Sequence, residues 1–337
     1  MVKLLLHIGL HRAASTAIQA WLIDNASQLA GQGCFMAAGQ QTGLEGNVLN
    51  ILTGQTFATI PEADVASIIA EDLDGRQQRF RAGILSDENI SGMMPNATRP
   101  PFLMAERLAR VLALMARRHE IVPMVVLREH VTWMISLYRV AQLRGETAGF
   151  EAFSRTIAAR PDLYSHMLQP IAAAAGPGPA IVTSQAAIAA DRGQTLLADI
   201  AAALGLNIPP GASLTRKNAS RNPLVCTLMQ DAARKGVQID LRALPRLPRL
   251  LDDLWRERAG PSAEDRAIAA RLLRRAATPE AGGPPLRLVH AEALLEGALS
   301  RCEEPVASHA LMAELRAFFA VDRDWIRAHH PAAIFEE

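Results

Sequence analysis

A short apolar segment at the start of the chain runs directly into a glycine-started loop and then into an amphipathic helix. The loop occupies residues 7–16 and reads HIGLHRAAST, and the helix after it begins AIQAWL. The loop carries the guanidinium of Arg12 and the adjacent hydroxyls of Ser15 and Thr16. Backbone N–H groups at a helix N-terminus and the helix dipole point at the same spot. The segment therefore predicts a site for a phosphate or a sulfate.

This loop differs from the P-loop of nucleoside triphosphatases, which reads G-x-x-x-x-G-K-[ST]. Counting from Gly9, the motif positions of the glycine, the lysine and the hydroxyl residue hold Ala14, Ser15 and Thr16. Because the motif lysine is missing, hydrolysis of ATP or GTP with Mg²⁺ is disfavoured.

The composition is that of a globular protein without a global preference for a charged partner. With 337 residues, 50% of them hydrophobic, the chain can bury a large core. Its net charge is +1, from 35 basic and 34 acidic residues. Neither a nucleic-acid partner nor a membrane-surface partner is expected from this balance. Attraction for anions must be local.

The cysteines and the apolar segments point to an ordinary reducing compartment. Cys34, Cys226 and Cys302 show no C-x-x-C spacing, which argues against a zinc site or a disulfide framework. The apolar start of the chain is interrupted by His7, and no long apolar stretch follows elsewhere. We expect a cytoplasmic location, with no targeting segment and no stable membrane insertion.

Strand-like and helix-like patterns alternate over the first two hundred residues. Strands are expected at residues 3–8, 82–85, 121–127 and 180–183, and helices after the loop and at about 102–119, 131–143 and 193–204. This alternation predicts an α/β three-layer sandwich with a central parallel sheet. Right-handed crossovers would place the strand ends, and a ligand, along one edge of that sheet.

From about Pro223 the sequence becomes rich in Arg, Ala and Pro and has a helical pattern. We therefore expect an α/β core over residues 1–223 and a helical subdomain over 224–337, an extension or cap packed on the core. Its last helix is expected at about 305–329. The arginines of this region attract an acidic acceptor or form a solvated face, and we favour the solvated face. They include Arg246, Arg249, Arg256 and Arg258.

Charged side chains stand where two of the predicted strands end. Arg128 follows the strand at 121–127, and the hydroxyl of Ser136 comes eight residues later on a helix. Glu88 follows the strand at 82–85 in the text SDEN. All could reach the ligand-binding edge of the sheet. The plainer alternatives are a surface ion pair for Arg128, a self-bonded helical serine, and a solvated loop or helix cap around Glu88.

A third cluster concentrates cations late in the predicted core. The text LTRKNASRNP contains Arg216, Lys217 and Arg221 within six residues of an otherwise neutral chain. A solvated basic loop is the alternative to an anion-binding loop, because runs of charge usually lie at the surface.

The loop at residues 7–16 resembles the 5′-phosphosulfate loop of sulfotransferases that use 3′-phosphoadenosine 5′-phosphosulfate. Bacterial members read roughly H-I-G-x-x-K-T-G-T-T-x-L-Q, and residues 7–9, 15–16 and 18–19 fit this pattern. Arg12 stands in place of the family lysine, and Ala13-Ala14 stand in place of Thr-Gly. Arginine keeps the charge but replaces a point charge by a planar fork.

Three further segments are similar to the same family in the same order, so the resemblance covers about residues 3–223. The family patterns are S-x-E, V-x-R-[EN]-P-x-x-x-x-x-S-x-Y and R-x-N-x-S. The matching residues are Ser86 and Glu88 for the first, Arg128, Glu129, Ser136 and Tyr138 for the second, and Arg216, Asn218 and Ser220 for the third. His130 replaces the proline of the second pattern. That replacement is expected to relax the turn and leave the phosphate ligands in place.

The resemblance implies a P-loop-like fold and metal-free, in-line transfer of a sulfuryl group from that donor to a hydroxyl, most simply of a carbohydrate or glycolipid. It implies that Arg12 stabilises the oxygen bridging to sulfur. It also implies that Glu88 takes the acceptor proton, provided that burial or geometry raises its basicity. The residues implied to bind the donor are Arg12, Ala13, Ala14, Ser15, Thr16, Arg128, Ser136, Arg216, Lys217 and Asn218.

Other parts of the family pattern are absent or leave alternatives open. Ser184-Gln185 follow the strand at 180–183, where the family often has a Tyr-Glu pair near the adenine, so adenine must stack elsewhere. We assign His7 to packing and take His11 as a candidate acceptor contact. The alternatives to a sulfotransferase are a nucleotide-binding protein without transfer activity and a divergent nucleotide kinase.

Overall fold

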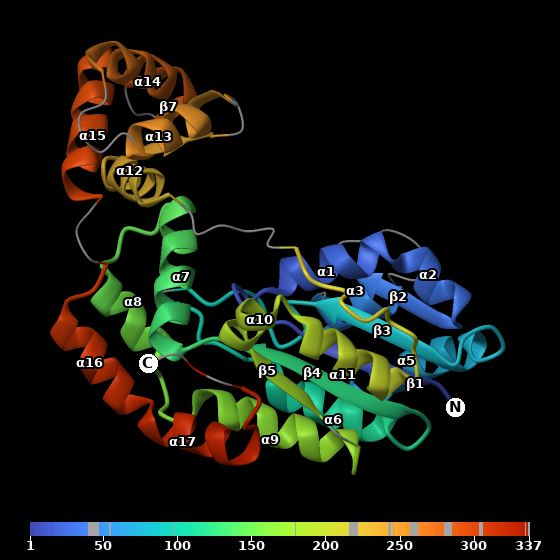
Figure 1. Ribbon diagram of the computed structural model, residues 1–337. Coiled ribbons are helices and arrows are strands. Elements are labelled where there is room, and N and C mark those ends of the chain that lie inside the picture. Colours follow the sequence, from blue (N-terminus) through green and yellow to red (C-terminus); the bar gives the residue numbers. More distant parts are fainter. Residues whose placement is uncertain are drawn as a thin grey trace.

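The chain folds around a five-stranded parallel β-sheet with helices on both faces (Figure 1). The computed structural model describes residues 1–39, 47–53, 55–96, 98–178, 180–215, 222–241, 244, 246–256, 262–279, 285–302, 306–333 and 335. The strands are β1 (Lys3–Ile8), β2 (Cys34–Ala38), β3 (Ala82–Asp87), β4 (Glu120–Leu127) and β5 (Ile181–Ser184). Their order across the sheet is β2-β3-β1-β4-β5, and every pair is parallel. The predicted α/β class with a central parallel sheet is confirmed.

The strands form where the chain is apolar on both faces. β1 reads KLLLHI, and every residue after its first is buried. β1 pairs with β3 on one side and with β4 on the other, so that Leu5 lies opposite both Ile84 and Val122. Continuous burial of this kind is typical of parallel sheets, because helices cover both faces. β1 is thereby the central strand.

Helices α1, α2 and α11 lie on one face of the sheet, and α5, α6 and α9 form the opposite layer (Figure 1). Their bounds are α1 (Ser15–Asp24), α2 (Ala26–Gly31), α5 (Glu62–Arg76), α6 (Ala105–Met115), α9 (Leu163–Ala175) and α11 (Gln194–Leu204). The shorter or flanking helices are α3 (Asn47–Thr53), α4 (Gln55–Thr59), α7 (His130–Leu143), α8 (Phe150–Ile157) and α10 (Gln185–Asp191). The chain therefore leaves β1 toward one face, and leaves β3 and β4 toward the other.

Two hydrophobic clusters organise the molecule. The first joins the sheet and its helices with residues 307–335, and the second lies within residues 224–302. The second contains α12 (Pro223–Arg234), α13 (Arg246–Arg256), α14 (Ala263–Ala276), α15 (Leu288–Arg301) and the hairpin of β6 (Val237–Ile239) and β7 (Ala277–Pro279). Helices α16 (His309–Phe318) and α17 (Ala320–His329) return to the sheet-containing part (Figure 1). The predicted helical region 224–337 is thus divided by its packing.

The second cluster joins the first through α7 and α12. The side-chain amide of Gln142 donates to Gln230 Oε1 (3.0 Å), and Gln230 Nε2 donates to the hydroxyl of Tyr138 (2.7 Å). Tyr138 donates in turn to the carbonyl oxygen of Ala148 (2.9 Å). This buried network fixes the helical subdomain to the end of α7.

Several element boundaries differ from those expected. The helix after the loop begins at Ser15, before the expected Ala17, and α2 follows after Asn25. The helix expected at 305–329 is divided into α16 and α17 at Phe319. β2 and α5 were not expected, whereas β1 has its predicted bounds. Among the described helices, none has the length and apolar character required to cross a bilayer.

Candidate functional site

The candidate site lies at the carboxyl end of β1, where the chain directions diverge. A ligand in an open α/β sheet binds outside the carboxyl ends of the strands, at the point where neighbouring connections run to opposite faces. β1 occupies that point, because α1 and the helices after β3 and β4 cover different faces. The loop after β1 therefore lies between the strand-end residues Glu88 and Arg128.

Gly9 allows the loop to approach the end of β3 closely. Its N–H donates to the carbonyl oxygen of Asp87 (3.2 Å). A Cβ at Gly9 would stand 2.6 Å from the hydroxyl oxygen of Ser15 and 3.0 Å from the Cα of Glu88. A Cβ here would push the Ser15 hydroxyl and the end of β3 aside, so glycine serves the close approach and not a positive φ angle.

The loop ends in a left-handed turn that exposes the start of α1. Ala14 precedes α1 with φ 63° and ψ 0°, and its side chain offers no acceptor for the helix N-terminus. In the part of the chain that the structure describes, the N–H groups of Ala14 and Ser15 make no hydrogen bond. An open helix N-terminus of this kind has the backbone donors and the dipole orientation that suit an anion.

Two loop groups expected to bind the donor are already engaged. The N–H of Ala13 donates to the carbonyl oxygen of Leu10 (3.1 Å), and the Ser15 hydroxyl donates to the same oxygen (3.2 Å). Ala13 and Ser15 were both among the residues implied to bind the donor, and in this arrangement the Ala13 amide is not available for that role. Thr16 is exposed and lines the cavity beside the loop.

The two arginines of the site lie next to each other. Arg12 Nε donates to the Ser136 hydroxyl (3.1 Å), and Arg128 Nη1 donates to the carbonyl oxygen of Arg12 (3.1 Å). Burial and the neighbouring charge of Arg12 lower the pKa of Arg128. No carboxylate among the described residues pairs with Arg128. Two adjacent, half-buried cations create a local positive potential, which attracts an anion.

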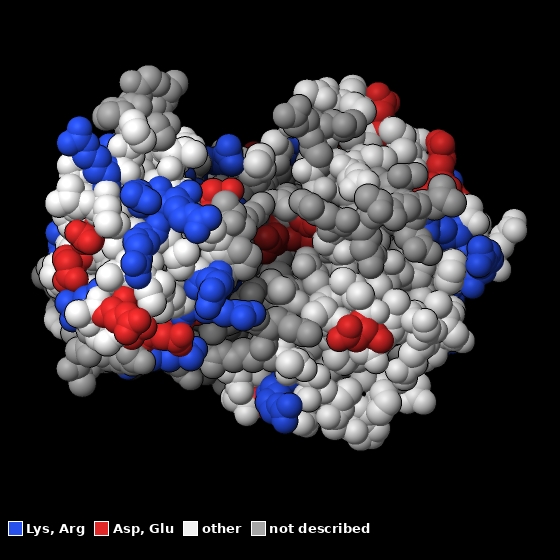
Figure 2. Space-filling model, turned by 90° about the horizontal axis from the view of Figure 1, so that it is seen from above, with Lys and Arg blue, Asp and Glu red and all other residues white. Residues whose placement is uncertain are grey.

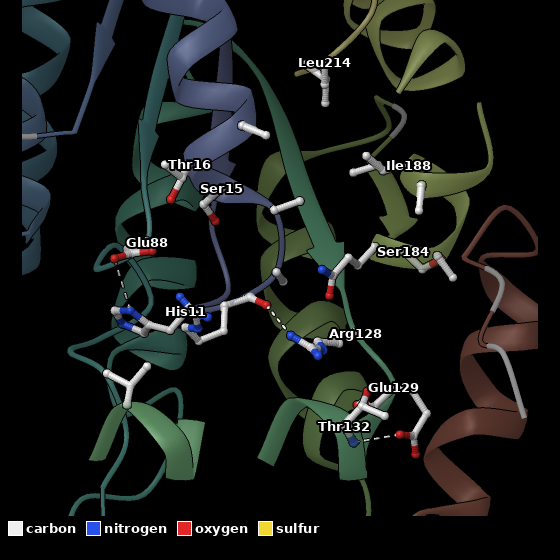
Figure 3. A pocket seen from close by; sticks show the side chains of 18 of the residues that line it. His11, Ser15, Thr16, Glu88, Arg128, Glu129, Thr132, Ser184, Ile188 and Leu214 are labelled. Atoms are coloured by element: carbon white, nitrogen blue, oxygen red, sulfur yellow. Dashed lines mark hydrogen bonds and ion pairs between the residues drawn. The ribbon is translucent and has the colours of Figure 1, made fainter. Parts of the chain in front are cut away.

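Glu88 lies on the opposite side of the loop, beside His11 (Figure 3). Its Oε1 is 3.6 Å from His11 Nδ1, an ion-pair distance that is too long for a good hydrogen bond. The other ring nitrogen of His11 lies 3.3 Å from the carbonyl oxygen of Gly92, so both nitrogens face acceptors. His11 lowers the pKa of Glu88 more than burial raises it. The condition set for Glu88 as the base, a basicity raised by burial or geometry, is therefore not met in this arrangement.

His7 is held apart from this chemistry. It is fully buried in the sheet, and its Nδ1 lies 2.7 Å from the hydroxyl oxygen of Ser86. Burial lowers the pKa of His7 to about 4, so the ring is neutral at neutral pH.

A cavity of about 890 Å³ joins these groups to an apolar region. Glu88 and His11 lie on one side of the loop, and Ser184, Ile188 and Leu214 lie on the other (Figure 3). Sequence reasoning missed several residues that line the cavity. They are Met94, Thr132, Val140, Leu143, Arg144, Ile188, Ala189, Arg192, Leu214 and Phe335. Thr132 follows β4 and Ile188 follows β5 within a few residues, which is a usable signal, whereas Phe335 is far from any strand of the sheet in sequence.

The remaining predicted residues either lie outside the described residues or do not line the cavity. Arg216, Lys217 and Asn218 lie outside the described residues, although Leu214 and Thr215 before them line the cavity. Arg246, Arg249 and Arg256 are exposed on α13. On the side of the molecule that holds α13, Lys and Arg side chains gather beside a hollow in the surface (Figure 2). No group of His, Cys, Asp and Glu that could hold a metal ion occurs within the described ranges.

The site is thus an open helix N-terminus flanked by two arginines on one side and by a carboxylate on the other. No family model, curated protein or solved structure matches this chain.

Proposed function

We propose that the chain is a sulfotransferase that moves a sulfuryl group from 3′-phosphoadenosine 5′-phosphosulfate to an acceptor hydroxyl. The observation that supports this most is the meeting of three segments far apart in sequence. The open start of α1, Arg128 and Glu88 border one cavity, and Ser136 contacts the lining of that cavity through Arg12. The order and spacing of these residues resemble the sulfotransferase patterns.

The donor would bind through its phosphates and its base. The N–H groups of Ala14 and Ser15 would take the 5′-phosphate, and Arg128 with Ser136 would take the 3′-phosphate. The apolar wall that includes Ile188 and Leu214 suits the face of an adenine. A cavity of about 890 Å³ has room for a nucleotide of this size.

The acceptor would approach from the side of Glu88. Its oxygen forms a bond to sulfur while the bond from sulfur to the 5′-phosphate oxygen breaks, and the electron pair leaves with adenosine 3′,5′-bisphosphate. Glu88 accepts the acceptor proton, and Arg12 stabilises the charge that develops on the leaving oxygen. Because the pKa of Glu88 is lowered, this carboxylate is ionised at neutral pH and is a weak base. The proton would then pass from the acceptor hydroxyl to Glu88 only when the new oxygen–sulfur bond is largely formed.

Binding is tested by calorimetric titration with adenosine 3′,5′-bisphosphate. Arg128→Ala removes a cation that would contact the phosphate and should weaken binding by about ten- to a hundredfold. Arg155→Ala removes an exposed arginine paired with Glu151 and is the matched control. Equal affinities of both variants and wild type would contradict the proposed site.

Turnover is tested separately, by mass spectrometry of acceptor panels incubated with the sulfuryl donor. Glu88→Gln should abolish most of the transfer and preserve bisphosphate binding, whereas Glu314→Gln on α16 should change neither. Tight bisphosphate binding without transfer to any acceptor would favour a nucleotide-binding protein that lacks activity. Stabilisation by ATP with Mg²⁺, and not by the bisphosphate, would favour a nucleotide kinase.

A further inference from the structure

A buried hydrogen bond connects the C-terminal helix α17 to His130, two residues after Arg128. His130 Nε2 lies 2.9 Å from Asp322 Oδ2, and the two residues are 1% and 0% exposed. Asp322 also accepts hydrogen bonds from the N–H groups of Tyr164 (2.7 Å) and Ser165 (2.9 Å) at the start of α9. One carboxylate therefore joins α7, α9 and α17.

Tyr164 extends this connection to Arg128. Its hydroxyl donates to the carbonyl oxygen of Arg128 (2.8 Å), and its ring stacks on His130 with centroids 4.3 Å apart. Phe319, between α16 and α17, stacks on His130 at 4.4 Å. The imidazole is thus enclosed between two aromatic rings while its Nε2 is held by Asp322. The backbone of Arg128 is held by the Tyr164 hydroxyl, so it belongs to the same set of contacts.

The residue between Arg128 and His130 is held as well. The carboxylate of Glu129 accepts hydrogen bonds from the N–H groups of Val131 (3.1 Å) and Thr132 (2.8 Å), which caps α7. Arg316 of α16 lies 4.0 Å from that carboxylate. Residues 128–130 are therefore fixed from both the α9 side and the C-terminal side.

Burying a charged carboxylate costs several kcal/mol unless its partners satisfy it completely. Burial favours the neutral form of Asp322, but hydrogen bonds from His130, Ser165 and the backbone of Tyr164 outweigh burial and lower its pKa. Apolar side chains would pack the same space without this cost. A buried carboxylate that accepts hydrogen bonds from α7 and α9, as Asp322 of α17 does, instead specifies one arrangement of those three helices.

We propose that Asp322, His130 and Tyr164 are positioning residues that hold Arg128 in the orientation that receives the anion. Helices α16 and α17 are then part of the anion site, and Phe335 beyond them lines the same cavity. This inference rests on the proposed function in one respect, the assignment of the 3′-phosphate to Arg128.

Tyr164→Phe tests the proposal, because it removes one hydroxyl and keeps the stacked ring. The Kd for adenosine 3′,5′-bisphosphate should rise about three- to tenfold, the effect of one hydrogen bond. The Kd for adenosine 5′-phosphate, which lacks the 3′-phosphate, should not change. Tyr138→Phe is the matched control, because its hydroxyl donates to Ala148 and not to Arg128. Equal changes in both Kd values, or no change in either, would overturn the proposal.

Hydrogen exchange in the absence of nucleotide separates this proposal from the proposed function. Tyr164→Phe and Asp322→Asn should speed exchange of the amides at residues 128–132, and Asp324→Asn on the exposed side of α17 should not. If the wild-type chain binds neither nucleotide, the proposed function fails, and faster local exchange still supports the positioning role. Unchanged exchange at residues 128–132 in Tyr164→Phe would contradict that role.

Discussion

At the scale of single residues, the site is built from backbone conformations that its side chains do not favour. Arg12 and Ala14 both adopt positive φ, at 70° and 63°. A residue with a Cβ in this region costs about 1–2 kcal/mol relative to the right-handed conformation. Strain of this kind persists where surrounding contacts determine the backbone, and functional sites are common places for it.

Ala14→Gly should therefore stabilise the protein. Relief of the left-handed strain outweighs the greater entropy of glycine in the unfolded chain, for a net gain of about 0.5–1 kcal/mol. Ala13→Gly is the matched control, since Ala13 is fully buried and has no positive φ. It should destabilise by about 1–2 kcal/mol. Urea denaturation of both variants measures the difference, and destabilisation by Ala14→Gly would show that Ala14 carries no strain.

Glu88 should contribute to the acid sensitivity of the fold. Its folded-state pKa lies below the ordinary value of 4.5, chiefly because of His11. A carboxylate with a depressed folded-state pKa stabilises the fold above its unfolded pKa, and this stabilisation is lost as the pH falls through the folded-state pKa. Between pH 6 and pH 3, the melting temperature of wild type should fall more than that of Glu88→Gln. Parallel melting curves would exclude the His11 interaction as a stabilising contact.

The site residues that follow a strand end could be predicted from the sequence. Arg12, Glu88 and Arg128 follow apolar segments, so their common edge followed from parallel-sheet geometry. The engagement of Ala13 with Leu10 and the lowered pKa of Glu88 depend on atomic contacts that no sequence spacing encodes. The pairing of His130 with Asp322 joins positions 192 residues apart and was equally inaccessible.

At the scale of elements, Gly9 and the start of α1 set how closely β1, β3 and the helix approach. Gly9→Ala introduces a Cβ that meets Ser15 and Glu88, so the loop must shift. We expect a loss of about 1–3 kcal/mol of stability together with weaker bisphosphate binding.

Gly75→Ala is the control for that change. Gly75 lies within α5, and a Cβ there meets nothing within 4 Å. Alanine should stabilise this helix by about 0.5–1 kcal/mol and leave binding unaltered. Thermal melts and calorimetric titrations of the pair give both readouts. A Gly9→Ala protein that is as stable as wild type would show that the loop is looser than its contacts indicate.

Elements with strong apolar patterns were predicted, and weakly patterned ones were not. β1 and β4 are mainly apolar segments, and their positions were predicted from the apolar pattern along the chain. β2 reads CFMAA, a short segment without β-branched residues, and it is a strand because β3 pairs with it. Tertiary pairing therefore overrides weak local preference there.

At the scale of the whole molecule, the two hydrophobic clusters should unfold with some independence. Leu273 of α14 is fully buried in the second cluster, and Leu5 of β1 is fully buried in the first. Each Leu→Ala change leaves a cavity that costs about 2–5 kcal/mol. Native-state hydrogen exchange should show Leu273→Ala raising exchange in α13–α15 while the sheet keeps its protection. Uniform acceleration across both clusters would indicate a single cooperative unit.

The proposed function is tested most directly by calorimetry on the wild-type protein. The affinity for adenosine 3′,5′-bisphosphate is compared with the affinity for ATP with Mg²⁺. We expect saturable one-to-one binding of the bisphosphate that Arg128→Ala weakens and Arg155→Ala does not. We expect ATP with Mg²⁺ to bind more weakly than the bisphosphate. Absence of bisphosphate binding, or tighter binding of ATP with Mg²⁺ than of the bisphosphate, would contradict the proposed function.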